Sequence, residues 1–472
     1  MRREVKLAIY GVLILSYIIT AALFLWIYLM IEPMLTLSPV PEGGGEPGVA
    51  PVPEGAPQIS QRLLLLYRLI RSPTMAAIFF SLFLIAVFLN EFSYIFLAIL
   101  HVFISRKRIR PISEWKSIPM VSIIVPAHNE EKVIEETIRT LLDTSYPNKE
   151  IIVVNDGSTD RTEEIVKPYA LRGEVILINR PNAGKAVALN TGVHVANGEI
   201  IVAIDADGAV ERDAITRLVA HFQDPNVVAV AGNVKVGNRV NLLTKLQALE
   251  YIREINLRRR ALDLLNTIYV VPGAIGAFRK SAYMQIGWYD RDTVAEDMDV
   301  TIKFLKTRGL IPYEGTAIVH TEAPETLKSW FRQRNRWYGG TLQTMVKHRA
   351  HWWRHGALSF VGFPYLYLSS IFVPVLEITA IGVGLIYSLL GLWRGVLLYF
   401  AAAMAVEFFC SILGILIDRE DPKLILLTPI YVLIYRYFVD FVRMKCYWNY
   451  YRGRLGWTRA ERYGGLGKKI GV

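Results

Sequence analysis

The sequence predicts an α/β domain with a mostly parallel sheet, flanked on both sides by transmembrane helices. Hydrophobic residues make up 53% of the 472 positions and charged residues 20%. That balance is too apolar for a purely soluble enzyme and too charged for a chain lying wholly in a membrane. From residue 120 onward, short β-branched runs alternate with helical stretches, which is typical of βαβ units.

Several apolar runs are long enough to cross a bilayer. Residues 7–31 contain no charge, and the run is too long for a signal peptide, so we predict an anchor that is retained. Because lipid offers no partner for unpaired backbone groups, these runs are expected to be helices. The other predicted spans cover residues 74–104, 359–392, 395–417 and 424–442.

The distribution of charge predicts the orientation. The loop 32–60 carries four acids and no Lys or Arg, and its twelve Pro and Gly residues predict an extended or mobile segment. The basic run 106–110 follows the second span directly. Lys and Arg near span ends favour the cytoplasm, so the N-terminus and residues 105–358 are placed inside a multi-pass cell-membrane protein. Anionic lipid, rather than nucleic acid, is the expected partner of the basic run.

The C-terminal tail conflicts with this count of spans. Residues 443–472 hold eight Lys or Arg and one acid, which predicts a cytoplasmic tail, whereas three spans after a cytoplasmic domain would place the tail outside. Either one segment does not cross, or the run 359–392, which contains two prolines, has a more complex path. The predicted division is 1–105 (two spans), 106–341 (catalytic domain), 342–358 (interfacial amphipathic helix), 359–445 (C-terminal spans) and 446–472 (basic cytoplasmic tail).

Polar segments follow the predicted strands, where ligands bind in open α/β sheets. The strands cover residues 121–125, 150–154, 175–178 and 199–204, with helices near 130–143, 160–170 and 184–197. The polar segments that follow three of these strands are 126–130, 155–158 and 205–207.

Three charged motifs could carry chemistry. Asp205 and Asp207, one residue apart at a strand end, could both reach Mg²⁺ or Mn²⁺, although a helix-capping turn would use the same residues. Glu296 and Asp297 lead into a helix, where an acid could deprotonate a hydroxyl or could simply stabilise the helix N-terminus. The segment 332–337 combines three arginines with a tryptophan, which suits phosphate binding or a basic helix lying on anionic lipid.

Taken in order, these motifs resemble those of the processive family 2 glycosyltransferases, the group of cellulose, chitin, hyaluronan and poly-N-acetylglucosamine synthases. Each motif alone is common, but the six in order are highly specific. The resemblance covers about residues 115–345 and implies a GT-A fold with a Rossmann-like sheet. The motifs are Val-Pro-Ala-His-Asn-Glu (125–130), Asn-Asp-Gly-Ser (155–158), Asn-Ala-Gly-Lys (182–185), Asp-Ala-Asp (205–207), Glu-Asp (296–297) and Gln-Arg-Asn-Arg-Trp (333–337).

The resemblance also implies a role for each matched residue. A UDP-sugar would be held at its uracil and ribose by Pro126, Ala127, Glu130 and Asp156, and at its phosphates or sugar by Lys185 and Asp205. The metal would be bound by Asp207 together with Asp205, and the general base would be Asp297, next to Glu296. Pyrophosphate and the acceptor end would be bound by Gln333, Arg334, Arg336 and Trp337, with Gly273 on the acceptor floor.

The finer pattern is closest to the poly-N-acetylglucosamine branch. Pro-Gly-Ala at 272–274 replaces the Cys-Gly-Ser of cellulose synthases, whereas 271–279, 321–326 and the tail 456–462 fit that branch. The implied function is inverting, processive synthesis of a β-linked polysaccharide from UDP-N-acetylglucosamine, or next from UDP-glucose, with extrusion through the spans. The implied partners are the donor, the growing polysaccharide and the bilayer, with no nucleic acid; an accessory subunit stays open.

Two alternatives remain at this stage. A single-transfer enzyme could load one sugar onto a lipid carrier, although such enzymes usually lack the Gln-x-x-Arg-Trp motif present at 333–337. A non-catalytic membrane scaffold or channel would have no use for Asp205, Asp207, Asp297 and Trp337 together.

Overall fold

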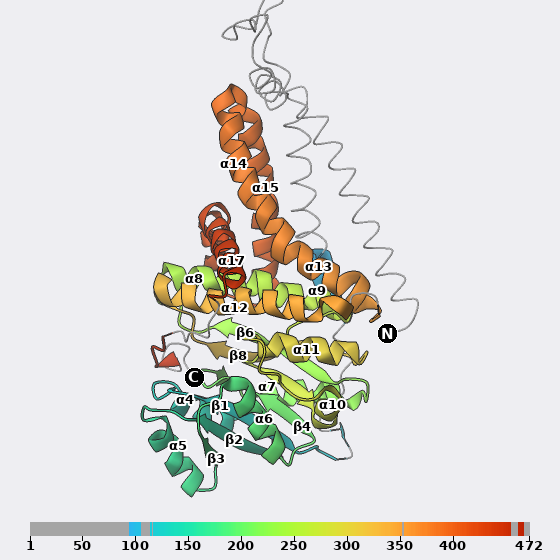
Figure 1. Ribbon diagram of the computed structural model, residues 1–472, viewed down its shortest axis with the longest axis vertical. Helices are drawn as coiled ribbons and strands as arrows, with labels where there is room; N and C mark the ends of the chain where they lie inside the picture. The colour runs from blue at the N-terminus through green and yellow to red at the C-terminus, as the bar shows by residue number, and fades with distance from the viewer. Residues whose placement is uncertain (1–93, 105–113, 116, 352–353, 455–460, 467–472) are drawn as a thin grey trace, which may run out of the picture. The chain divides into compact units, whose positions relative to one another are not determined.

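The computed structural model describes residues 94–104, 114–115, 117–351, 354–454 and 461–466 (Figure 1). The predicted span 7–31, the loop 32–60 and the basic run 106–110 therefore lie outside the described residues, as does most of the span 74–104. The chain divides into two compact units. One contains residues 368–410 of the described chain, and the other contains Tyr94–Tyr367 with the residues from Ser411 onward.

The larger unit is built on an eight-stranded sheet with the strand order β3-β2-β1-β4-β7-β6-β8-β5 (Figure 1). The strands are β1 (Val121–Ala127), β2 (Lys149–Asp156), β3 (Ile176–Arg180), β4 (Ile200–Ala203), β5 (Ala209–Val210), β6 (Ala229–Val236), β7 (Gly276–Arg279) and β8 (Tyr313–Thr321).

The first half of the sheet is the predicted run of βαβ units. Strands β1 to β4 are mutually parallel and are connected by the helices α4 (Ile134–Leu142), α5 (Thr162–Leu171) and α6 (Lys185–Val195). Ile123 packs into the core cluster that contains α4, whereas the next residue, Ile124, faces Gly192 of α6. Successive side chains of a strand point to opposite faces, so β1 is covered on both.

Strand β4 returns beside β1 rather than beside β3, which makes the β1–β4 boundary a topological switch point. Ligands bind at such points, beyond the carboxyl ends of the strands. The turns that follow Ala127 and Ala203 therefore meet at one edge of the sheet.

The second half corrects the prediction of a mostly parallel sheet. Strand β7 is antiparallel to both β4 and β6, and β5 is antiparallel to β8, so the sheet is mixed. Strand periodicity reports burial and not direction, which is why the sequence did not reveal this reversal. Gly276 at the start of β7 pairs with Ala203 at the end of β4, so the segment before β7 joins the same edge.

Helices α8, α9 and α12 lie together beside β6 and β8 (Figure 1). The predicted interfacial helix 342–358 begins within α12, which continues through His348 and is followed by the 3-10 helix η4 (Arg349–His351). Other helical elements of this unit are α7 (Ala214–Val219), α8 (Leu242–Glu250), the π-helical η3 (Tyr251–Leu257), α9 (Arg258–Leu264), α10 (Lys280–Ile286), α11 (Glu296–Lys306) and α12 (Leu327–His348).

Among the described residues, two helical stretches are long and apolar enough to cross a membrane, Leu358–Asp418 and Pro422–Tyr451. The first is broken at Gly391, whose φ of 90° is left-handed. On either side of that break, Tyr387 of α14 (Val373–Tyr387) and Val396 of α15 (Trp393–Asp418) form a small apolar core. The break at Gly391 lies within the predicted span 359–392, one residue before its end.

The close approach of α6 to β1 is testable at Gly192. A Cβ at this position would overlap the side chain of Ile124, so Gly192→Ala should force α6 away from the sheet. Overpacking of this kind costs about 1–3 kcal/mol, which should appear as a lower melting temperature of the purified protein in detergent. Val195→Ala, at an exposed position of the same helix, is the control and should melt like the unmodified chain. Equal melting temperatures for all three proteins would contradict this packing.

Candidate active site

The ammonium of Lys185 joins two of the predicted site residues. Lys185 Nζ lies 2.7 Å from Asp205 Oδ1 and 2.9 Å from Glu296 Oε1. Lys185 is the first residue of α6, Asp205 follows β4, and Glu296 is the first residue of α11. Three segments that are far apart in the sequence therefore meet at one charge.

Asp156 holds the loop that presents Lys185. Its carboxylate accepts hydrogen bonds from the amides of Ala183 and Gly184, at 3.1 Å and 2.8 Å, and lies 2.6 Å from Arg180 Nη1. Gly184 has a φ of 93°, which favours glycine at this point. Asp156 was predicted to hold uracil and ribose, and that role stays a prediction. Arg180 was not recognised from the sequence, because a single arginine after a strand carries no motif.

Asp297 is held by backbone amides at the start of α11. Oδ1 accepts from Met298 N at 2.8 Å, and Oδ2 accepts from Gly273 N at 3.4 Å. Burial and the neighbouring Glu296 raise the pKa of Asp297 to about 6, against the opposing effect of Lys185. At neutral pH this carboxylate is ionised and is still a stronger base than an ordinary aspartate.

Gly273 connects the two halves of the site. A Cβ on this residue would lie 2.7 Å from Lys185 Nζ and 3.5 Å from Asp205 Oδ1, so a side chain here would displace the ammonium from its carboxylates. Since the Gly273 amide also reaches Asp297, the residues around Asp205 and Asp297 form one constellation.

Asp207 and Glu130 share an arginine from the C-terminal tail. Asp207 Oδ2 accepts from Thr321 Oγ1 at 3.0 Å and pairs with Arg462 Nη1, while Arg462 Nε lies 2.9 Å from Glu130 Oε2. The tail 456–462 was noted from the sequence only for its resemblance; because Arg462 follows these partners by 255 and 332 positions, no local signal showed which carboxylates it meets.

Residues 461–466, the C-terminal strap, are fastened to the same unit. The amides of Tyr463 and Gly464 donate to the carboxylate of Glu322, at 2.9 Å and 2.6 Å, and the Glu461 amide donates to Ser329 Oγ at 3.0 Å. Leu466 is buried beside Gly237. The strap therefore lies on the same side as the constellation.

The predicted nucleoside-binding residues lie at the neighbouring strand ends. Pro126 and Ala127 close β1, where Ala127 pairs with Asn155 of β2, directly before Asp156. Glu130 follows in the turn after β1 and is buried. The sheet thus gathers all four predicted residues along the edge that carries Asp205.

Arg334 and Arg336, the two arginines of the predicted Gln-Arg-Asn-Arg-Trp motif, lie in different surroundings. Burial opposes ionisation of Asp205, but Lys185, then Arg462 and Arg336, lower its pKa below the usual value. Arg334 is fully buried, with Nη2 2.5 Å from Glu250 Oε2.

Gln333 and Trp337 of the motif lie close to Arg334. Gln333 accepts a hydrogen bond from Arg334 at 2.9 Å. The half-buried ring of Trp337 lies 6.0 Å from that of Tyr251.

Comparison with known proteins matches residues 122–287 to the model of glycosyl transferase family 2. The chain carries a family 2 glycosyltransferase domain. Poly-β-1,6-N-acetyl-D-glucosamine synthases are among its relatives, with 32% identity over 237 residues in Staphylococcus epidermidis and 34% over 230 residues in Staphylococcus aureus strain COL. These alignments cover 50% and 48% of this chain and only 58% and 56% of the two synthases.

A solved structure shows the same fold. The mannosyltransferase of Pyrobaculum calidifontis, in complex with GDP-Man and Mn²⁺, matches 80% of this chain and 99% of its own, with a TM-score of 0.56 and 21% identity. This likeness confirms the predicted GT-A, Rossmann-like fold of the glycosyltransferase domain.

The Asp205–Asp207 turn of the glycosyltransferase domain suits a divalent cation. Asp205 Oδ2 and Asp207 Oδ1 accept no hydrogen bond from any residue that the structure describes, whereas Lys185 and Arg462 hold the other oxygen of each carboxylate. Mg²⁺ and Mn²⁺ prefer such oxygen ligands. The two aspartates therefore fit the predicted metal.

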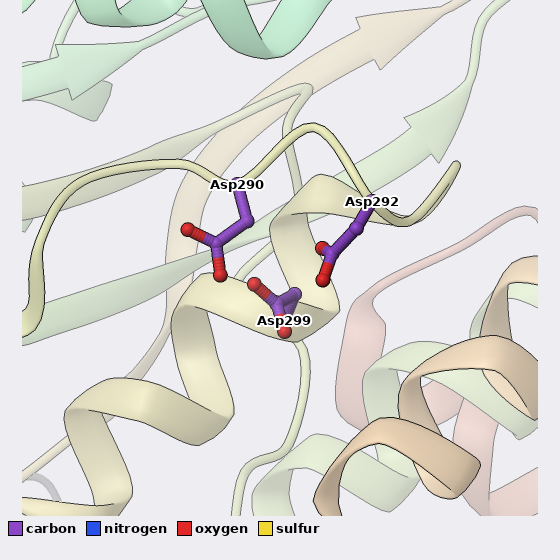
Figure 2. Close-up of side chains that lie close together, drawn as sticks. All are labelled: Asp290, Asp292 and Asp299. Atoms are coloured by element: carbon purple, nitrogen blue, oxygen red, sulfur yellow. The ribbon is translucent and has the colours of Figure 1, made fainter.

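A second acidic group in the glycosyltransferase domain is already neutralised. Figure 2 shows Asp290, Asp292 and Asp299 turned toward one another, but Lys347 Nζ lies 2.6, 2.7 and 3.0 Å from their oxygens. His348 Nε2 is also 2.8 Å from Asp299. Through Lys347 and His348, these contacts hold α11 against α12.

The pKa of Asp297 predicts the acidic limb of the pH–rate profile. Because the carboxylate must be ionised to accept a proton, kcat/KM of the unmodified chain should fall below about pH 6. Glu296→Gln removes a charge that raises the pKa of Asp297, so the limb should move to lower pH, by about one unit. Asp292→Asn, at an exposed acid of the preceding loop, should leave the limb in place. Loss of activity at every pH in Glu296→Gln would instead make Glu296 a reacting group.

Arg462 is expected to matter for nucleotide binding. Arg462→Ala leaves Asp207 and Glu130 without their shared countercharge, so the affinity for UDP with Mn²⁺ should fall about tenfold or more. Isothermal titration calorimetry measures this, and Arg454→Ala, at an exposed arginine before the strap, is the matched control. Equal affinities in the two variants would mean that the strap plays no part in donor binding.

Proposed function

We propose that the chain is an inverting, processive membrane glycosyltransferase that polymerises a β-linked polysaccharide from a UDP-sugar. UDP-N-acetylglucosamine is the favoured donor and UDP-glucose the next. The observation that carries this proposal is the constellation in which Lys185 links Asp205 to Glu296 while Gly273 touches Asp297. The names of the staphylococcal relatives support the choice of polymer.

The donor is placed along the carboxyl edge of β1, β2 and β4. Pro126, Ala127, Glu130 and Asp156 hold the nucleoside, and the diphosphate runs toward Asp205 and Asp207. Asp205 and Asp207 would hold Mg²⁺ or Mn²⁺, which when bound would neutralise phosphate charge. Lys185 and Arg336 add fixed positive charge on the side where UDP departs.

Transfer proceeds in one displacement. Asp297 takes the proton of the acceptor hydroxyl, the hydroxyl oxygen forms a bond to C1 of the donor sugar, and the bond from C1 to the diphosphate oxygen breaks. Attack from the face opposite the leaving group inverts the configuration at C1. A base with a pKa of about 6 is ionised at neutral pH and can still accept a proton as the new bond forms.

The acceptor end rests against Gly273, Gln333 and Trp337, whose indole offers an apolar surface to a sugar ring. The helices Leu358–Asp418 and Pro422–Tyr451 supply the membrane-embedded part of a multi-pass protein, through which the polysaccharide is extruded. The catalytic unit faces the cytoplasm. Because the C-terminal strap is fastened to that unit, the tail is cytoplasmic as well.

The central experiment gives purified protein in detergent a panel of UDP-sugars with Mg²⁺ or Mn²⁺. We expect long products from UDP-N-acetylglucosamine that a β-1,6-specific hydrolase digests. Products carrying a single added sugar would support transfer to a lipid carrier instead. No turnover of any donor would refute the enzymatic proposal.

The base assignment is tested by Asp297→Asn. This change keeps the shape of the side chain and removes its basicity, so transfer should fall by at least about a thousandfold while UDP binding stays close to that of the unmodified chain. Product formation and calorimetric UDP titration are measured on the same preparations. Asp290→Asn, at an aspartate outside the constellation, is the control; full activity in purified Asp297→Asn would refute the assignment.

A further inference from the structure

A chain of buried hydrogen bonds leads from the apolar helix Pro422–Tyr451 toward the predicted acceptor site. The Tyr435 hydroxyl donates to Glu250 Oε2 at 2.7 Å, and Arg334 Nη2 lies 2.5 Å from the same oxygen. Tyr435 is 4% exposed, Glu250 6% and Arg334 0%. Tyr435, Glu250 and Arg334 together form the buried relay.

At its far end the buried relay orients two predicted acceptor-binding residues. The guanidinium carbon of Arg334 lies 4.3 Å from the centre of the Trp337 ring, within the range of a cation–π contact. Arg334 Nη1 also donates to Gln333 Oε1 at 2.9 Å. One buried guanidinium thus fixes both an indole and an amide.

Arg334 does not face the carboxylates around Asp205. A helix turns by about 100° per residue, so residues two apart point to nearly opposite sides. Arg336 acts on Asp205, whereas the guanidinium of Arg334 is occupied by Glu250 and Gln333. The two arginines of one motif therefore have separate tasks, one at the donor and one beneath the acceptor.

Stability alone is a poor explanation for this arrangement. A buried ion pair often adds little to stability compared with apolar residues of the same volume, because both charges must leave water. What it does provide is a fixed geometry, since the directions of its hydrogen bonds leave few alternatives. The Tyr435 hydroxyl strengthens that constraint, because it also accepts from Trp330 Nε1 at 3.0 Å.

We propose that Glu250 and Tyr435 are positioning residues for the acceptor site of the function proposed above, on which this inference rests. Acting through Arg334, they fix Trp337 and Gln333. The position of the helix Pro422–Tyr451 therefore determines where the terminal sugar of the acceptor lies. Neither residue takes part in donor binding.

The decisive variant is Tyr435→Phe in the full-length chain. Removing this hydroxyl should raise KM for an added N-acetylglucosamine oligosaccharide about fivefold and shorten the products, while the affinity for UDP stays unchanged. The matched control is Tyr431→Phe, one turn earlier on the same helix. The Tyr431 hydroxyl makes no hydrogen bond with the described residues, and its ring contact with Arg253, at 5.0 Å, is retained.

Glu250→Gln tests the relay as a unit. If Tyr435 and Glu250 act through one arginine, the double variant should affect acceptor KM no more than the more severe single variant. If Glu250→Gln does not fold, because it leaves Arg334 buried without a countercharge, Tyr435→Phe alone decides the proposal.

Two results would overturn it. One is a Tyr435→Phe protein with a lower melting temperature and maximal rate but with acceptor KM and product length as in the unmodified chain. The other is a change in donor affinity with no change in acceptor use.

Failure of the proposed function gives a different result. In that case the unmodified chain transfers no sugar from any UDP-sugar. The relay is then tested by oligosaccharide binding, measured through tryptophan fluorescence. Binding that Tyr435→Phe weakens supports the buried relay. No binding by the unmodified chain contradicts the buried relay.

Discussion

The ammonium of Lys185 allows several carboxylates to share one site. Asp205, Glu296 and Asp297 would repel one another strongly at a partly buried site unless a cation lay among them. Lys185 meets the first two at 2.7 Å and 2.9 Å, and although burial opposes its charge, the carboxylates raise its pKa above the usual value. It therefore stays charged, while burial and Glu296 raise the pKa of Asp297.

The position of that ammonium is determined by its supports. Asp156 fixes the loop before α6 through the amides of Ala183 and Gly184, and Gly192 lets α6 lie close against β1. Gly273 leaves the room that the ammonium occupies. Each support acts through backbone geometry, so the charge is placed before any ligand binds, which is what electrostatic catalysis requires.

The sequence predicts the first half of the domain better than the second half. The strands and helices from β1 to β4 follow from β-branched runs and helical spacing, and the site residues after each strand follow from the rule for open sheets. The direction of β7 does not follow, because antiparallel pairing leaves no mark on burial. It is this strand that carries Gly273 to the constellation.

The contacts that the sequence could not reveal are long-range pairings of single charges. Arg462 with Asp207, Arg180 with Asp156 and Glu250 with Arg334 have no periodicity and no common spacing. The motif at 333–337 was recognised as a set. Its division into one arginine for the donor site and one for the buried relay depends on helix geometry and on partners elsewhere in the chain.

The segment matched by the family model lacks several partners of its own charged residues. That match ends at residue 287, before Asp297, before α12 and before the strap. Residues 122–287 contain Lys185, Asp205 and Asp207, but there Asp207 would lack Arg462 and Glu250 would lack Arg334. Buried carboxylates without their partners are costly, so the second half of the chain completes the charge balance of the first as well as supplying Asp297, the proposed base.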